Sequence, residues 1–363
     1  MKNILNSGKI NAILEKAVAG VRITPCEALD IYRFADFLKV MDAARAVRCK
    51  MSDPGVVTYT LFRIVNYTNI CSSTCSFCGF HRAPGDPSGR VLTIDEILSK
   101  MQASGAAGVR QLFLQGGVNP EISFDYYRNV LRSIKREFGD DIHIRAFSPC
   151  EIRGMELLTG RSAREIIREL KSAGMDSMPG AGAEILSDRV RTEISPKKIS
   201  TAEWLRIMEE CFEEHLPGSA NIVIGSIETP VEIIEHLRVV RDLQDRTGGL
   251  SSFIPWTFQK QTAGFPIRNV PAREYLKLLG ICRLFFDNIP HIEASLLCMG
   301  RGMGELALNA GADDISSVVF EENVLTSHGL NTEAEAHEFI RDCGFTPMYR
   351  DLLYSGLRAS LDL

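Results

Sequence analysis

The sequence predicts an α/β protein whose main unit is a (β/α)8 barrel of the TIM type, preceded by a helical extension. From Leu61 onward, short β-rich runs alternate with capped helical segments, and this alternation repeats eight times. No linker interrupts the series, which favours one closed barrel over an open doubly wound sheet, the alternative architecture. We expect residues 1–60 to form the helical extension, and residues 61–363 to form the barrel with a C-terminal helical segment.

Helix start signals separate the expected strands. Thr93–Glu96 has the pattern of a capping box followed by apolar residues at helical spacing, and Ser200–Glu203 repeats it. Thr229–Glu232 adds Pro at the first helical position, and Thr24–Glu27 marks a helix in the N-terminal extension. The eight expected strands are Leu61–Thr68, Gln111–Leu114, His143–Phe147, Met175–Met178, Ala220–Ile224, Phe253–Trp256, Ile292–Leu297 and Ile315–Phe320.

Composition limits the partners of this protein. Of its 363 residues, 45% are apolar and 24% are charged, as in ordinary globular domains. A formal net charge of −5 gives no basic surface, so we expect no nucleic-acid partner. No apolar run approaches the roughly 20 residues of a membrane helix. Lys9, Glu15 and Lys16 interrupt any signal-peptide core. We therefore expect a cytoplasmic protein without a membrane partner.

Three of the ten cysteines are clustered directly after the first expected strand. Cys71, Cys75 and Cys78 follow the pattern C-x3-C-x2-C, and active sites of such barrels lie where strands end. One interpretation adds His81 to make a structural zinc site in a binding protein, since each spacing is permitted. Structural zinc usually joins separated arms, however, whereas these four candidates lie within eleven residues.

A [4Fe–4S] cluster is the second interpretation of the three cysteines. Such a cluster takes one thiolate for each iron, so three cysteines leave the fourth iron with a free coordination position. A cluster that only carries electrons is served by four protein ligands, whereas an incomplete set suits a cluster that binds a substrate. The missing fourth ligand therefore indicates the position where chemistry takes place.

This spacing, with the aromatic Phe77 just before the last cysteine, resembles the signature of the radical S-adenosylmethionine (SAM) enzymes. The resemblance implies that Cys71, Cys75 and Cys78 bind a [4Fe–4S] cluster and that SAM chelates its open iron. The reduced cluster then cleaves SAM to a 5′-deoxyadenosyl radical. It also implies an external one-electron donor such as flavodoxin or ferredoxin.

The same resemblance implies that residues at the ends of successive strands bind SAM. A plain tight turn is the alternative for the glycine pair, and a solvated surface position is the alternative for either arginine. The residues expected to contact SAM are Phe77, Gln115, Gly116, Gly117, Ser148, Glu151, Glu184, Arg189, Arg191, Ile227 and Glu228.

Phrases along the whole chain resemble one branch of this superfamily. They are "VNYTNIC", "GFHRAPG", "LQGGVNP", "AFSPCEI", "GAEILSDRVR", "SPKKIS", "TGGLSSFIPWTFQ" and "FEENVL". Together they are similar to the futalosine-pathway enzymes of menaquinone biosynthesis and the related deazaflavin (FO) synthase. The Trp–x–Phe–Gln pattern favours the cyclase of that pathway. Aminofutalosine synthase or FO synthase-type chemistry remains the alternative.

The resemblance also implies a reaction and its site. The adenosyl radical removes the C4′ hydrogen of the ribose in dehypoxanthine futalosine, and the carbon radical adds to the benzoate ring. Loss of an electron and a proton then gives the cyclic product, which requires a dry pocket and a base. The residues expected to line this pocket, with a packed loop as the alternative, are Trp256, Phe258, Gln259 and Thr262.

Two residues are candidates for the base. His81 lies on the cysteine loop at the expected barrel mouth. Glu293, expected midway along the seventh strand, is the second candidate, because a buried carboxylate without a partner is costly. His143 and His291 precede or begin their strands, so we expect them at the opposite end, where structural roles prevail.

Overall fold

The computed structural model describes residues 2–105, 109–259, 265, 267–320, 330, 332–354 and 356–358. Its helices are α1 (Lys2–Val18), α2 (Pro25–Phe34), α3 (Phe37–Met51), α4 (Ile94–Gly105), α5 (Phe124–Phe138), α6 (Pro149–Thr159), α7 (Ala163–Ala173), α8 (Asp188–Ile194), α9 (Thr201–Glu213), α10 (Pro230–Thr247), α11 (Ala272–Phe285), α12 (Leu296–Met299), α13 (Arg301–Asn309) and α14 (Glu333–Asp342). Its strands are β1 (Val56–Asn66), β2 (Gln111–Gln115), β3 (His143–Ala146), β4 (Gly218–Ile224), β5 (Leu250–Thr257), β6 (His291–Ile292), β7 (Asp314–Phe320), β8 (Thr346–Arg350) and β9 (Leu357–Arg358).

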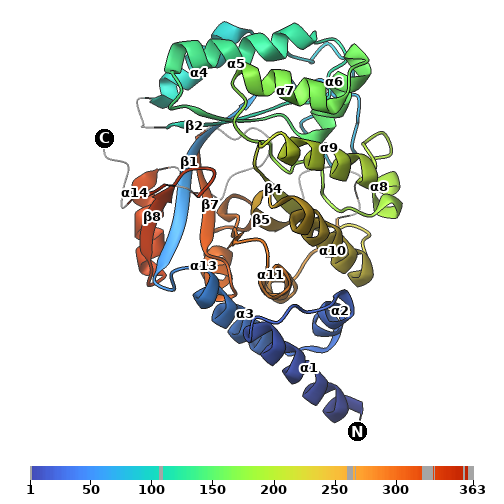
Figure 1. The fold of residues 1–363 in the computed structure, drawn as a ribbon, viewed down its shortest axis with the longest axis vertical. Helices are drawn as coiled ribbons and strands as arrows, with labels where there is room; N and C mark the ends of the chain where they lie inside the picture. The colour runs from blue at the N-terminus through green and yellow to red at the C-terminus, as the bar shows by residue number, and fades with distance from the viewer. Residues whose placement is uncertain are drawn as a thin grey trace.

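Parallel strands form a ring at the centre of the molecule (Figure 1). β1 pairs with β2 and with β7, β3 pairs with β2, and β4, β5 and β6 form a second sheet. Isolated parallel bridges join the two sheets into the ring, and they connect Arg145 to Ser177, Met178 to Gly218, and Glu293 to Asp314. The predicted barrel is therefore confirmed, and the open sheet is not the architecture of this chain.

Several strand limits differ from the prediction. β1 begins at Val56, because β8 extends the sheet along residues 56–59. The fourth expected strand contributes only bridges at Ser177 and Met178. The seventh was expected over 292–297, but β6 ends at Ile292 and α12 follows. Leucine and methionine form helices readily, so the apolar run "SLLCM" fits a short helix as well as a strand.

The N-terminal helices cover one side of the barrel. α3 packs on α11 and α2 packs on α10, and Figure 1 shows the three helices together at one end of the molecule. Thr24 and Glu27 form the predicted capping box, and Arg22 bridges to Asp245 and Asp287 at 2.6 and 2.7 Å. Within the described residues, none of the helices has the length and apolar character of a membrane span.

Charged side chains fill the barrel near the N-terminal ends of its strands. Arg350 of β8 reaches Asp314, the first residue of β7, through two hydrogen bonds of 2.6 and 3.0 Å. Its Nη2 also lies 3.5 Å from Glu293 Oε1. Thr58 of β1 donates to Asp314 Oδ2 at 2.6 Å. All three charged side chains are at most 4% exposed, so each charge depends on its partners.

We expect the variant Arg350→Met to be destabilised, because it leaves Asp314 and Glu293 buried without their cation. Breaking a buried pair from one side costs about 3–5 kcal/mol of unfolding free energy. Denaturant unfolding followed by circular dichroism measures the loss. Arg358→Met, at an exposed position of β9, is the control and should change little. Equal stability of the two variants would contradict this account of the barrel interior.

Candidate active site

The three cysteines lie on a loop that leaves the C-terminal end of β1. Ser72 donates its backbone N–H to Val118 O at 2.8 Å, and the Val118 N–H reaches Cys71 Sγ at 3.3 Å. Cys78 N–H closes a turn onto Cys75 O at 3.1 Å. Thr74 has a φ of +42°, a left-handed conformation that a β-branched residue rarely adopts. The loop is thus fixed by its neighbours in a strained form, which is common at binding sites.

The glycine pair after β2 allows two loops to cross closely. A Cβ on Gly117 would lie 2.2 Å from Ile70 O and 2.7 Å from Cys71 Cβ, and one on Gly116 would meet the Tyr67 ring at 2.6 Å. The Gly117 N–H donates to Thr68 O at 3.0 Å. These glycines therefore set the distance between the loop after β2 and the cysteine loop. The side chain of the preceding Gln115 is half-buried at the end of β2.

Ser148 and Glu151, expected to contact SAM, already have partners within the protein. They form the capping box at the start of α6. Glu151 Oε1 accepts from the Tyr67 hydroxyl at 2.6 Å and from the Gly116 N–H at 2.9 Å. Burial raises the pKa of this carboxyl. The structure therefore gives both residues a role in joining α6 to the loops after β1 and β2.

Both predicted arginines have partners within the protein. Exposed Arg189 forms a two-pronged ion pair with Glu232, both contacts being 2.7 Å. Buried Arg191 donates to the carbonyls of Ala183 and Ile199 at 2.7 and 2.9 Å and so holds the loop before α8. Both guanidinium groups therefore have partners within the fold, and their contact with SAM stays a prediction.

Ile227 and Glu228 lie in the loop after β4. The Glu228 side chain is buried and accepts from the backbone N–H groups of Gly225 and Ser226 at 2.6 and 2.9 Å. Ile227 is partly buried against the core. The buried Glu228 side chain thus shapes this loop.

A buried cation that the sequence did not predict lies at this end of the barrel. Lys198 donates to Glu184 Oε1 at 2.7 Å, and the two side chains are 9% and 15% exposed. Glu184 has a φ of +36°, and its buried Oε2 has no hydrogen-bond partner among the described residues. The sequence "SPKKIS" alone gave no signal, since two adjacent lysines usually indicate a solvated surface.

Aromatic side chains connect the cysteine loop to the segment after β5. The rings of Phe77 and Phe258 have their centres 5.1 Å apart, and Phe265 lies 5.9 and 5.4 Å from them. Lys198 Nζ lies 5.4 Å from the centre of the Phe77 ring. The structure thereby brings together a predicted cofactor residue, Phe77, and a predicted pocket residue, Phe258.

Inward-facing residues of the strands add to this region. Trp256 Nε1 donates to the side-chain oxygen of Asn221 at 3.2 Å. This holds for the orientation of the Asn221 amide in which both its oxygen and its nitrogen have a hydrogen-bond partner. Half-exposed Phe62 and Phe113 meet edge to face at 6.0 Å, whereas their neighbours Leu61 and Leu112 are buried in the core. Strand side chains alternate between faces, so Phe62 and Phe113 face the barrel interior.

The remaining pocket candidates are only partly described. Gln259 is half-buried, and its Nε2 donates to Thr257 O at 3.0 Å. Thr262 lies outside the described residues.

The two candidate bases lie in different surroundings. His81 is half-buried on the cysteine loop, with Nδ1 2.7 Å from Cys78 O. Glu293 belongs to the polar layer near the N-terminal strand ends, where Ser252 and Tyr354 donate to its Oε1 at 2.6 and 3.2 Å. Although burial opposes ionisation, Arg350 holds the pKa of Glu293 below its usual value. The premise that Glu293 has no partner is wrong.

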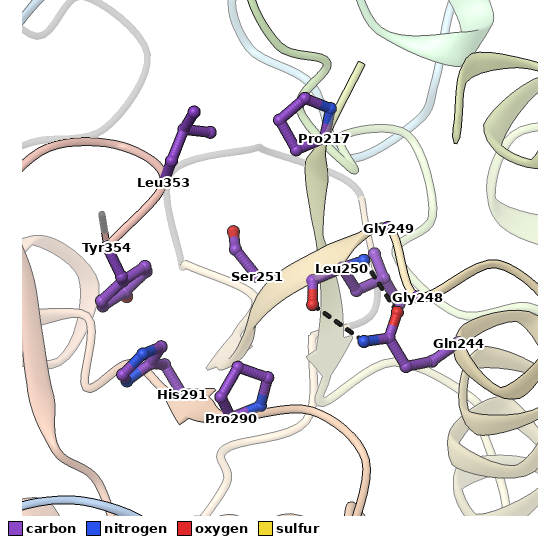
Figure 2. Close-up of a pocket in the computed structure, with 10 residues that line it drawn as sticks. All are labelled: Pro217, Gln244, Gly248, Gly249, Leu250, Ser251, Pro290, His291, Leu353 and Tyr354. Atoms are coloured by element: carbon purple, nitrogen blue, oxygen red, sulfur yellow. Dashed lines mark hydrogen bonds between the residues drawn. The ribbon is translucent and has the colours of Figure 1, made fainter. Parts of the chain in front are cut away.

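Figure 2 shows a separate pocket of about 400 Å³. It is lined by residues at the starts of β4, β5 and β6, among them Pro217, Leu250 and His291. The His291 and Tyr354 rings stack 3.7 Å apart, and Asp313 Oδ2 lies 2.7 Å from His291 Nδ1. The stacked ring of Tyr354 and the contact with Asp313 hold His291 at this pocket.

The donor atoms of the cysteine loop fit an iron–sulfur cluster. Within the described residues, no three Cys, His, Asp or Glu side chains converge in a way that would hold a single metal ion. A zinc site needs such convergence, whereas a [4Fe–4S] cluster takes each thiolate at a different iron. Burial raises the pKa of Cys75 to about 11, and Lys198 opposes this rise, so the Cys75 thiolate is disfavoured unless a positive partner such as an iron ion stabilises it.

Comparison with known proteins agrees with this geometry. Residues 65–240 match the Radical SAM superfamily model, and residues 247–361 match the CofH/MqnC C-terminal region. A relative from Halalkalibacterium halodurans, named cyclic dehypoxanthine futalosine synthase, is 38% identical over 97% of this chain and 96% of its own. A relative of the same name from Streptomyces coelicolor is 39% identical over 96% of this chain and 89% of its own.

A relative with a different name is also similar over its whole length. The 5-amino-6-(D-ribitylamino)uracil–L-tyrosine 4-hydroxyphenyl transferase of Methanopyrus kandleri is 34% identical over 99% of this chain and 100% of its own. Among solved structures, the hydrogenase maturase HydG from Carboxydothermus hydrogenoformans has a TM-score of 0.75 at 17% identity, over 97% of this chain and 82% of its own. The latter likeness concerns the fold. The chain belongs to the radical SAM superfamily, and it is an enzyme whose cofactors are a [4Fe–4S] cluster and SAM.

Proposed function

We propose that this enzyme converts dehypoxanthine futalosine to cyclic dehypoxanthine futalosine in menaquinone biosynthesis. The observation that carries this proposal is the 38–39% identity to two cyclic dehypoxanthine futalosine synthases over nearly the whole chain. The Trp256–Gln259 segment that favoured this branch spans the C-terminal end of β5 at the mouth of the barrel, and it includes Phe258, which contacts Phe77.

FO synthase-type chemistry is the second candidate, and a specific observation favours it. Relatives named 5-amino-6-(D-ribitylamino)uracil–L-tyrosine 4-hydroxyphenyl transferase are 31–35% identical over 90–99% of this chain. The family model that matches residues 247–361 carries the joint name CofH/MqnC, so this match does not by itself separate the two reactions. The lower identity places this candidate second.

The proposed roles at the cluster follow from the loop. Cys71, Cys75 and Cys78 each bind one iron, and Glu184 contacts SAM through the unpartnered Oε2. With SAM bound and an external donor such as flavodoxin or ferredoxin, the reduced cluster would give one electron to SAM and cleave it to methionine and the 5′-deoxyadenosyl radical, which would remove the C4′ hydrogen of the substrate. The close crossing at Gly117 keeps the loop after β2 beside this position.

The aromatic residues at the mouth form the proposed substrate pocket. Phe258 packs on Phe77, and Trp256 is oriented by Asn221, so both rings are held by neighbours before substrate arrives. Phe62 and Phe113 continue this apolar surface into the barrel. A rigid apolar wall excludes water and holds the benzoate ring close to the C4′ radical, as an addition reaction requires.

We propose His81 as the general base. A carbonyl oxygen only accepts hydrogen bonds, so the contact with Cys78 O places the proton of neutral His81 on Nδ1. Nε2 then carries the lone pair that accepts the proton lost as the ring regains aromaticity. Glu293 is not proposed as the base, because its charge is balanced by Arg350 at the other end of the barrel.

Replacement of any single cluster ligand should abolish SAM cleavage. Cys71→Ala, Cys75→Ala and Cys78→Ala each remove the anchor of a separate iron, so iron content after anaerobic reconstitution should fall as well. Cys298→Ala, at a buried cysteine of α12, is the matched control and should retain both. Loss of iron in Cys298→Ala to the extent seen in Cys75→Ala would show that the ligands are assigned wrongly.

Product identification tests the proposed reaction. The reduced, reconstituted enzyme with SAM should convert dehypoxanthine futalosine to a product two hydrogens lighter, as detected by mass spectrometry. This mass follows from loss of the C4′ hydrogen and of one ring proton with one electron. Parallel incubation with tyrosine and 5-amino-6-(D-ribitylamino)uracil tests the second candidate. An inert first substrate and a coupled product from the second pair would overturn the cyclase proposal.

His81→Gln should separate radical formation from cyclisation. The variant should still form 5′-deoxyadenosine with substrate present, because the cysteines and the SAM contacts are unchanged. Cyclic product should fall by roughly 10²–10⁴-fold, the usual contribution of a positioned general base. Glutamine retains hydrogen-bonding capacity at this position. Chromatography of both products checks the ratio, and an unchanged yield of cyclic product would exclude His81 as the base.

A further inference from the structure

The buried cation beside the cysteine loop has no role in the proposed reaction. Lys198 Nζ lies 2.7 Å from Glu184 Oε1 and 5.4 Å from the centre of the Phe77 ring. Phe77 stands between Cys75 and Cys78 in the sequence. The ammonium is therefore held next to the part of the loop that carries two of the three cluster ligands.

The surroundings of Lys198 keep it charged and in place. Burial alone would lower the pKa of the ammonium, but the ion pair with Glu184 at 2.7 Å opposes this and holds the pKa above its usual value. A Cβ on Gly182 would lie 3.6 Å from Lys198 Cε and 2.5 Å from Cys150 Sγ, so the lysine stem is packed against this turn. Lys198 is thus a fixed positive charge with little access to solvent.

A fixed charge in this position acts strongly on a neighbouring redox centre. Reduction adds one negative charge to an iron–sulfur cluster, and the charges and hydrogen bonds around a cluster set its potential. Two charges several ångströms apart interact more strongly in a poorly solvated site than in water. A cation there stabilises the reduced form, and an anion stabilises the oxidised form.

We propose that Lys198 sets the reduction potential of the cluster by stabilising its reduced form, and that Glu184 positions the ammonium and moderates its effect. Lys198 is in this view an electrostatic positioning residue, and its effect is present before SAM or substrate binds. The inference depends on the cluster and not on the identity of the substrate. Failure of the cyclase proposal would therefore leave it unchanged.

The test is a redox titration of the reconstituted cluster, followed by the electron paramagnetic resonance signal of the reduced form, in the absence of SAM. In Lys198→Met, the ratio of reduced to oxidised cluster at a fixed solution potential should fall by roughly ten- to a hundredfold. Lys197→Met is the matched control, because the neighbouring Lys197 is exposed, and it should titrate like the unaltered enzyme. Lys198→Arg keeps the charge and should remain close to it.

Glu184→Gln provides a test of opposite sign. It removes the anion while keeping the size of the side chain, so the reduced cluster should become more populated at the same potential. If Lys198→Met does not bind a cluster, the titration of Glu184→Gln alone tests whether these charges set the potential. Unchanged titrations of Lys198→Met and Glu184→Gln, or shifts of the same sign in both, would overturn the proposal. Loss of SAM affinity without any shift in the SAM-free titration would make Lys198 a SAM ligand instead.

Discussion

The first strand, β1, forms hydrogen bonds with three parallel strands, and the arrangement of the barrel depends on them. β8 pairs with its first residues, β7 runs along its middle, and β2 pairs with its last four. The lower part of β1 thereby meets the charged layer around Arg350, through Thr58. Its upper end leads directly into Cys71, where the glycines after β2 approach closely. Pairing that secures the strand thus also fixes the origin of the cysteine loop.

The fold was largely predictable because its signals are local and repeated. Capping boxes at Ser200 and Thr229 start helices where the sequence predicted them. The segment after Ile292 was not predictable in the same way, since leucines and a methionine fit a strand or a helix. The pairing of β8 with β1 was also missed, because it joins residues almost three hundred positions apart. Tertiary contacts of that kind decide where strands begin and end.

The candidate site also combines features that follow from local sequence patterns with features that depend on long-range contacts. The cysteine spacing is a local pattern, so the loop and its position after β1 followed from the sequence. Arg189, Arg191 and Lys198 lie within ten residues of one another, yet only the structure distinguishes them. Arg189 is paired with Glu232 of a different helix, Arg191 clamps backbone carbonyls, and Lys198 is buried beside Phe77. A sequence shows which residues carry charge, but the partners that occupy each charge come from elsewhere in the chain.

The buried carboxylates at the two ends of the barrel differ in how fully they are paired. At the N-terminal ends of the strands, the carboxylates of Glu293 and Asp314 both pair with Arg350, so their charges stabilise the fold. At the mouth, Glu184 keeps one buried oxygen without a partner and adopts a strained backbone. Unmet hydrogen-bonding capacity and strain are costly, and they persist where a ligand makes use of them. The proposed SAM contact of Glu184 agrees with this principle, because a bound cofactor would supply the partner that its second oxygen lacks.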